Sequence, residues 1–103
     1  MSDLTALWSA EAEADLDRID AYLSQHSPNA ASAFAGAVLD AVESLLGHPE
    51  AGSKVEGIIG GRSYRSLHVE PHHRLYYRVD GGQLLLARIW DTRREPEALT
   101  LTS

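Results

Sequence analysis

The spacing of the apolar residues changes halfway along this chain, and that change limits the folds it can adopt. Between residues 12 and 45 the apolar residues recur every three or four positions, which is the period of an amphipathic helix. Between residues 64 and 90 they alternate or run together, which is typical of strands. Helices followed by strands in one short chain predict an α+β fold, with helices packed on a mainly antiparallel sheet.

Two helices are expected in the first fifty residues. Ser9 can cap the first helix, because its hydroxyl accepts a hydrogen bond from an unpaired backbone amide. The apolar face of this helix is the stripe Ala12, Leu16, Ile19 and Leu23. Asp15 and its charged neighbours fall off the stripe and are expected to face water. Ser27-Pro28 favours the start of a second helix and Gly47 its end, so the two helices are predicted to form an antiparallel hairpin.

The remaining elements are expected to be strands. One opens the chain at residues 4–8, and three follow at 64–69, 73–79 and 84–90. The last two are joined by Asp80-Gly81-Gly82, a strong hairpin signal because such turns need positive φ, which glycine adopts readily. The predicted order is β-α-α-β-β-β in a single domain of 103 residues, with residues 94–103 as a flexible or short helical tail.

Charge is distributed unevenly along the chain. The net charge is −6, but the first fifty residues carry nine acidic residues and one basic residue, whereas residues 54–94 carry eight basic and four acidic residues. The strands are therefore expected to meet an acidic partner. Cysteine is absent, which excludes disulfides and thiolate metal sites. No signal peptide or membrane-length apolar run is recognisable, so a cytoplasmic protein without membrane contact is expected.

Three sequence segments in the second half of the chain resemble those of a known protein family. Residues 61–67 are GRSYRSL, residues 73–79 are HRLYYRV, and residues 84–94 are LLLARIWDTRR, followed by Pro96 and Leu99. In this order, after a strand and a helical hairpin, they resemble the RelE/ParE toxin superfamily over nearly the whole chain. The resemblance implies a toxin of a type II toxin–antitoxin system, neutralised by an antitoxin whose C-terminal segment wraps across it.

The superfamily divides by mechanism, and the resemblance leaves both mechanisms to be considered. RelE-like members cleave mRNA on the ribosome. For that activity Arg74 would hold the phosphate, and Glu50 or His73 would act as base. Against it, Lys54 is the only lysine, and a pI near 5.2 is low for an RNA-binding enzyme. We therefore favour the ParE-like branch, whose characterised members cut no RNA and mostly inhibit DNA gyrase. A third possibility is an inactive toxin fold that only binds an antitoxin.

Binding residues are expected among the arginines and aromatic residues of the second half. Carboxylates of the antitoxin are predicted to contact four strand arginines, Arg65, Arg74, Arg78 and Arg88. Aromatic and arginine side chains dominate binding hot spots, and the target-binding residues are predicted to be Trp90, Arg93, Arg94 and Leu99. No cofactor is expected. No metal is expected either, because the histidines at 68, 72 and 73 lack the spacing of a recognised zinc site.

Overall fold

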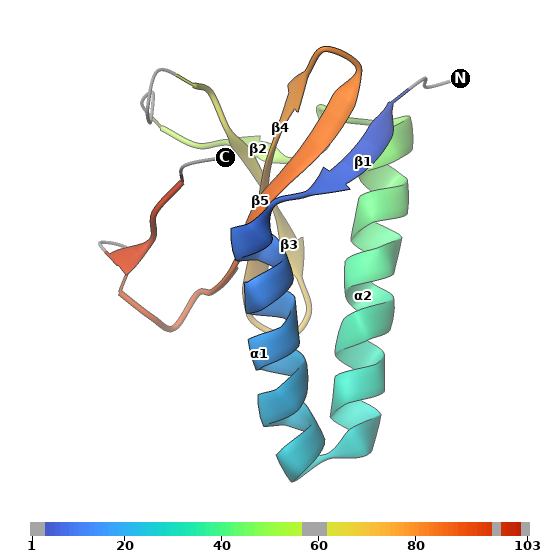
Figure 1. The fold of residues 1–103 in the computed structure, drawn as a ribbon, viewed down its shortest axis with the longest axis vertical. Helices are drawn as coiled ribbons and strands as arrows, with labels where there is room; N and C mark the ends of the chain where they lie inside the picture. Colours follow the sequence, from blue (N-terminus) through green and yellow to red (C-terminus); the bar gives the residue numbers. More distant parts are fainter. Residues whose placement is uncertain (1–3, 57–61, 96–97, 102–103) are drawn as a thin grey trace.

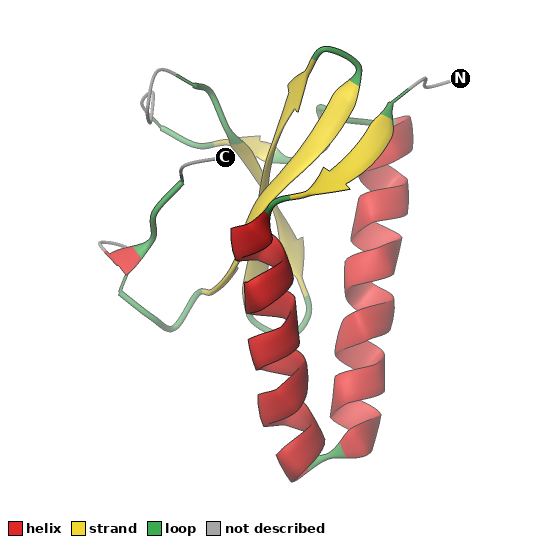
Figure 2. Cartoon of the chain, in the orientation of Figure 1, coloured by secondary structure: helices red, strands yellow, loops and turns green. Residues whose placement is uncertain are grey.

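The computed structural model describes residues 4–56, 62–95 and 98–101 and confirms the α+β fold (Figure 1). The elements are, in chain order, β1 (Thr5–Trp8), α1 (Ala10–His26), α2 (Pro28–Gly47), β2 (Ser53–Lys54), β3 (Arg65–Val69), β4 (His73–Asp80) and β5 (Gln83–Asp91). The two helices run side by side as a hairpin on one side of the sheet (Figure 2). The short strand β2 is the one element without a counterpart in the predicted order.

Serine caps set the starts of both helices as expected, whereas α2 includes Gly47 and has His48 as its C-terminal cap. The Ser9 hydroxyl accepts a hydrogen bond from the amide of Ala12 at 3.0 Å, and the Ser27 hydroxyl accepts one from Ala30 at 3.2 Å. Pro28 occupies the first turn of α2, where its missing amide hydrogen leaves no hydrogen bond unmade. Only the Ser27 junction separates the two helices, so they must pack antiparallel.

The sheet is antiparallel except at one edge. Its strand order is β1-β5-β4-β3-β2, and β1 lies parallel to β5. Gly81 and Gly82 have φ of 55° and 79°, and Asp80 pairs with Gln83, so the predicted two-residue turn is confirmed. A bulge interrupts the β4–β5 register between Tyr76 and Tyr77. β1 pairs with β5 only as far as Trp8, because the chain then turns into α1.

The main core lies between the helices and the sheet. Phe34, Val38 and Leu45 of α2 pack with apolar residues from the three long strands, among them Leu75 and Leu86. Composition alone would allow α2 to cross a membrane, since it is 20 residues long and apolar. Its buried stripe instead covers the sheet, as expected of a core helix.

A smaller cluster forms on the opposite side of the sheet, which we call the far face. Tyr64, Ala87 and Leu101 are buried together there, and Leu99 packs against them. Leu101 is only 5% exposed. The described part of the C-terminal segment, residues 98–101, is therefore packed against the domain. The flexible or short helical tail predicted for residues 94–103 lies partly outside the described residues and stays a prediction.

Candidate binding surfaces

The four strand arginines do not form one row. Neighbouring residues of a strand point to opposite faces, and His73, Leu75 and Tyr77 are the buried members of β4. Arg74 and Arg78 therefore lie on the far face. Arg65 pairs with Tyr77 across the sheet and so lies on the helical side. A peptide that contacts all four arginines would have to pass over an edge of the sheet.

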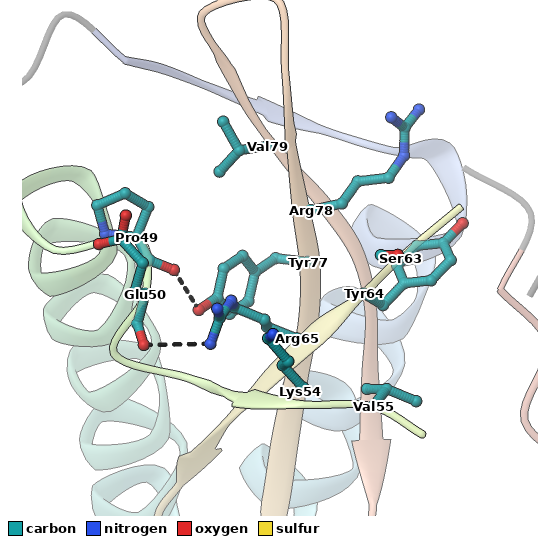
Figure 3. Close-up of a pocket in the computed structure, with 10 residues that line it drawn as sticks. All are labelled: Pro49, Glu50, Lys54, Val55, Ser63, Tyr64, Arg65, Tyr77, Arg78 and Val79. Atoms are coloured by element: carbon teal, nitrogen blue, oxygen red, sulfur yellow. Dashed lines mark hydrogen bonds between the residues drawn. The ribbon is translucent and has the colours of Figure 1, made fainter. Parts of the chain in front are cut away.

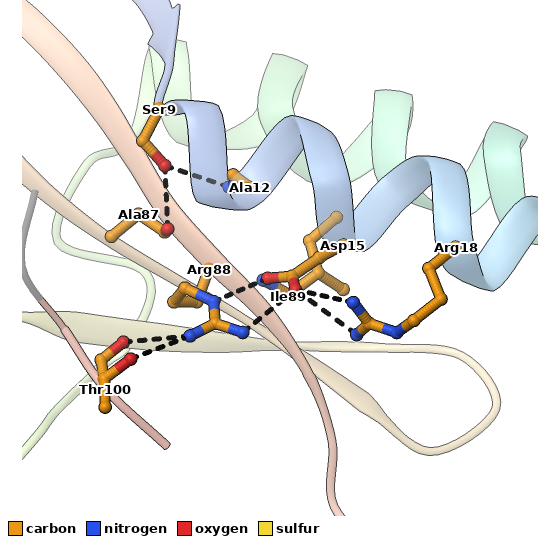
Figure 4. Close-up of polar contacts among 8 residues, drawn as sticks. All are labelled: Ser9, Ala12, Asp15, Arg18, Ala87, Arg88, Ile89 and Thr100. Carbon is orange, nitrogen blue, oxygen red and sulfur yellow. Dashed lines mark hydrogen bonds and ion pairs between the residues drawn. The ribbon is translucent and has the colours of Figure 1, made fainter. Parts of the chain in front are cut away.

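Arg88 is held inside the protein by Asp15 (Figure 4). Its Nε and Nη2 donate to the two Asp15 carboxylate oxygens at 2.7 and 3.0 Å, and its Nη1 donates to the carbonyl and hydroxyl oxygens of Thr100. Asp15 is 1% exposed, so the prediction that it faces water is wrong. The hydrogen bonds to Asp15 raise the pKa of Arg88. Its predicted role in antitoxin binding stays a prediction, and that role would require this contact to be exchanged.

Asp15 is buried where β1 ends, because a backbone amide of β5 needs a hydrogen-bond acceptor there. In the described part of the chain, no strand pairs with the outer edge of β5 beyond Leu86, so the Ile89 amide has no strand partner there. Asp15 accepts a hydrogen bond from that amide at 3.0 Å. Arg18 adds two further hydrogen bonds to the same carboxylate, each 3.2 Å long. The carboxylate thus caps the sheet edge and is balanced by two arginines.

A pocket of about 570 Å³ lies beside Tyr77, and we call it the Tyr77 pocket (Figure 3). The Tyr77 hydroxyl donates to the Pro49 carbonyl at 2.7 Å and accepts from the Gly52 amide at 3.0 Å. Arg65 donates to the Gly52 and Glu50 carbonyls at 2.8 and 3.3 Å. Burial raises the pKa of Tyr77, which keeps its hydroxyl protonated as a donor.

The three residues considered for RNA cleavage are not brought together. Glu50 borders the Tyr77 pocket. His73 lies at the opposite end of β4, 5% exposed, with its ring 4.8 Å from that of Phe34. Burial lowers the pKa of His73. Arg74 points to the far face and donates to the Ser66 hydroxyl at 2.9 Å. A base and a phosphate-binding arginine must reach one reacting group, and these side chains face different directions.

The residues predicted to contact the target differ in exposure. Trp90 is 4% exposed, with the Arg94 and Arg88 guanidinium groups 4.4 and 5.4 Å from its ring centre. Leu99 is half-buried in the far-face cluster. Arg93 and Arg94 are exposed. Hydrogen bonds from Arg93 hold the pKa of Asp91 well below its ordinary value. Only the two arginines present their side chains directly to solvent.

A second pocket, of about 330 Å³, was not predicted, and we call it the Tyr22 pocket. It lies between α1, the turn from β3 to β4, and residues 91–94. Arg18, Tyr22, Arg93 and Arg94 are among its lining residues. The sequence pattern placed Arg18 on the solvent side of α1, and nothing local shows that β5 ends beside it. Among residues 4–56, 62–95 and 98–101, no three His, Asp or Glu side chains are placed to hold a metal ion.

A helical hairpin on a mainly antiparallel sheet, with strand arginines on both faces, is the arrangement of a small α+β protein of the RelE/ParE toxin class. The chain belongs to the family described as the ParE toxin of the type II toxin–antitoxin system parDE, whose model matches residues 6–96. The structure is similar to a chain of the chromosomal ParDE toxin–antitoxin system from P. aeruginosa, with a TM-score of 0.65 and 26% identity. That similarity covers 84% of this chain and 92% of the other. A search of curated proteins found no match.

Proposed function

We propose that this ParE-family toxin acts by binding a cellular target, DNA gyrase, and not by cutting RNA. The observation that carries the proposal is the separation of Glu50, His73 and Arg74. Glu50 borders the Tyr77 pocket from the turn after α2, whereas His73 is buried at the start of β4 and Arg74 points to the far face. Metal-free cleavage of RNA would need such groups around one phosphate. An acidic chain with a single lysine also lacks the charge expected of a ribosome-bound nuclease. Action on gyrase places the toxin in the cytoplasm.

The proposed target surface is the exit from β5. Arg93 and Arg94 are exposed there, next to the buried ring of Trp90. Arginine presented beside an aromatic ring is a frequent arrangement at binding hot spots. We propose that these arginines contact the target first. Trp90 and Leu99 would join the interface only if Arg94 and the C-terminal segment moved away from them.

The second proposed partner is an antitoxin whose C-terminal segment neutralises the toxin. This proposal is supported by the similarity to a chain of a ParDE system and by the strand arginines. Charge reversal at Arg74 and Arg78 is expected to weaken antitoxin binding at moderate salt, because both project from the far face of β4. Unchanged affinity would remove these two arginines from the antitoxin interface.

Induction of the toxin in a bacterial host, with assays of its purified form, tests the proposal. We expect growth arrest, inhibition of gyrase supercoiling and intact messenger RNA. The antitoxin encoded beside the toxin gene should restore both growth and gyrase supercoiling. Arg93→Glu combined with Arg94→Glu should abolish the inhibition, whereas Leu39→Glu, an exposed site on α2, should not. Cleaved messages would support the RelE-like alternative. Unimpaired growth with retained antitoxin binding would indicate an inactive toxin fold.

A further inference from the structure

The Tyr22 pocket is lined by apolar residues and by three arginines, with Asp91 as its one acidic lining residue. Ile19 and Leu23 of α1 and Pro71 of the β3–β4 turn contribute apolar surface. Its volume of about 330 Å³ lies at the small end of the range of roughly 300–1,000 Å³ typical of ligand pockets. A cavity of this size suits one large apolar side chain better than a cofactor.

Tyr22 itself is unusually exposed for an aromatic residue. It is 58% exposed at the pocket, on a helix whose other exposed residues are mostly charged or polar. Its ring lies 4.5 Å from that of His26, one turn later, so it is held beside the cavity by a neighbouring ring. Exposed tyrosines next to an apolar hollow are preferred anchors at protein interfaces, because they combine a large apolar area with a hydroxyl.

The charges around the Tyr22 pocket indicate which charge a partner should carry next to its apolar side chain. Arg18 is the only basic residue among the first fifty, and it lines this pocket together with Arg93 and Arg94. The Arg18 and Arg93 side chains are 54% and 63% exposed although each contacts an aspartate. Arg94 lies over the Trp90 ring. Three arginines gathered from two distant segments favour carboxylates on the partner.

We propose that the Tyr22 pocket receives an apolar side chain of the antitoxin, with an adjacent carboxylate against Arg18 and the Arg93–Arg94 pair. The inference rests on the proposed function and assigns a docking point to its antitoxin. It also explains how an antitoxin could neutralise the toxin, since a peptide seated there covers the arginines proposed to meet the target. Burial lowers the pKa of His73, which also lines the pocket, and so favours the uncharged ring beside an apolar guest.

The test measures binding of the full chain to the purified antitoxin encoded beside it, by calorimetry at 150 mM salt. Tyr22→Glu places a negative charge at the pocket mouth, and we expect about a hundredfold weaker binding, equivalent to about 2.8 kcal/mol. Arg18→Gln is expected to weaken binding about tenfold. The matched controls are Leu39→Glu, an equally exposed apolar residue on α2, and Lys54→Gln on β2, each expected to change affinity less than threefold.

A second measurement does not depend on variants. Titration of the ¹⁵N-labelled chain with the antitoxin should shift the amide signals of residues 18–23 and 91–94 more than those of residues 37–41. Affinity within threefold of wild type for both pocket variants, or signals unchanged in these segments, overturns the inference while leaving antitoxin binding intact. Absence of binding by the unmodified chain overturns the proposed function and this inference together. Loss of self-association instead of antitoxin binding would assign the pocket to a second copy.

Discussion

Asp15→Asn is the most informative single change in this fold, because it removes one charge and almost no volume. The carboxylate is 1% exposed and accepts hydrogen bonds from Arg88 and the Ile89 amide. An asparagine oxygen can still accept from the Ile89 amide. Its NH₂ group, however, would face the guanidinium of Arg88, so two donors would oppose each other. The substitution therefore disrupts the ion pair with Arg88 but keeps the hydrogen bond from the Ile89 amide at the sheet edge.

The expected loss of folding stability is large for a side chain that lies off the apolar stripe of its helix. Removing one member of a buried ion pair costs about 3–5 kcal/mol, because the remaining charge stays desolvated. The Arg88 side chain is 14% exposed and keeps its hydrogen bonds to Thr100, which limits the loss. We therefore expect a decrease of about 3 kcal/mol in the free energy of unfolding. For a domain of this size that corresponds to a fall in Tm of roughly 15 °C.

Urea unfolding followed by circular dichroism measures the effect. The control is Asp17→Asn, which makes the same chemical change at an exposed position of α1 and should stay within about 0.5 kcal/mol of wild type. A double-mutant cycle with Arg88→Met isolates the pair, and we expect a coupling energy of about 2 kcal/mol. A loss below about 1 kcal/mol for Asp15→Asn, or a coupling energy near zero, would refute the view that this pair holds α1 to the sheet edge.

Three further changes test other parts of the structure. Gly52→Ala should destabilise by about 1–3 kcal/mol, since its Cβ would lie 2.5 Å from the Tyr77 hydroxyl, whereas Gly36→Ala in open space on α2 should stabilise by about 0.5–1 kcal/mol. Equal effects in urea unfolding would contradict the close packing of the loop. Because burial lowers the pKa of His73 below 6.5, the unfolded chain takes up the proton first, and stability should decrease as the pH falls below about 6.5. His73→Phe should reduce the difference between urea midpoints at pH 7.5 and 5.5, and an unchanged difference would assign the effect elsewhere. Leu101→Ala should lower the free energy of unfolding by about 2–3 kcal/mol if the C-terminal segment is part of the domain, and a thermal melt identical to wild type would show that it is not.

The sequence alone determined the features that depend on neighbouring residues. Both helix starts follow from serine caps at Ser9 and Ser27, and the β4–β5 turn follows from the paired glycines at 81 and 82. Apolar periodicity predicted both helices and the three long strands to within one or two residues of their observed ends. These signals are local, so they can be recognised in the sequence without knowledge of the fold. The antitoxin and target contacts remain predictions.

Only the tertiary structure decided which residues the polar side chains contact and on which face of the sheet they lie. Asp15 meets Arg88, 73 positions later, because β1 stops at Trp8 and exposes an edge of β5. The strand arginines divide between two faces because β3 and β4 pair in one particular register. The helical period of α1 could place Asp15 only relative to its own helix. Which strand edge, and which charge, lies opposite depends on long-range pairing that a local pattern does not contain.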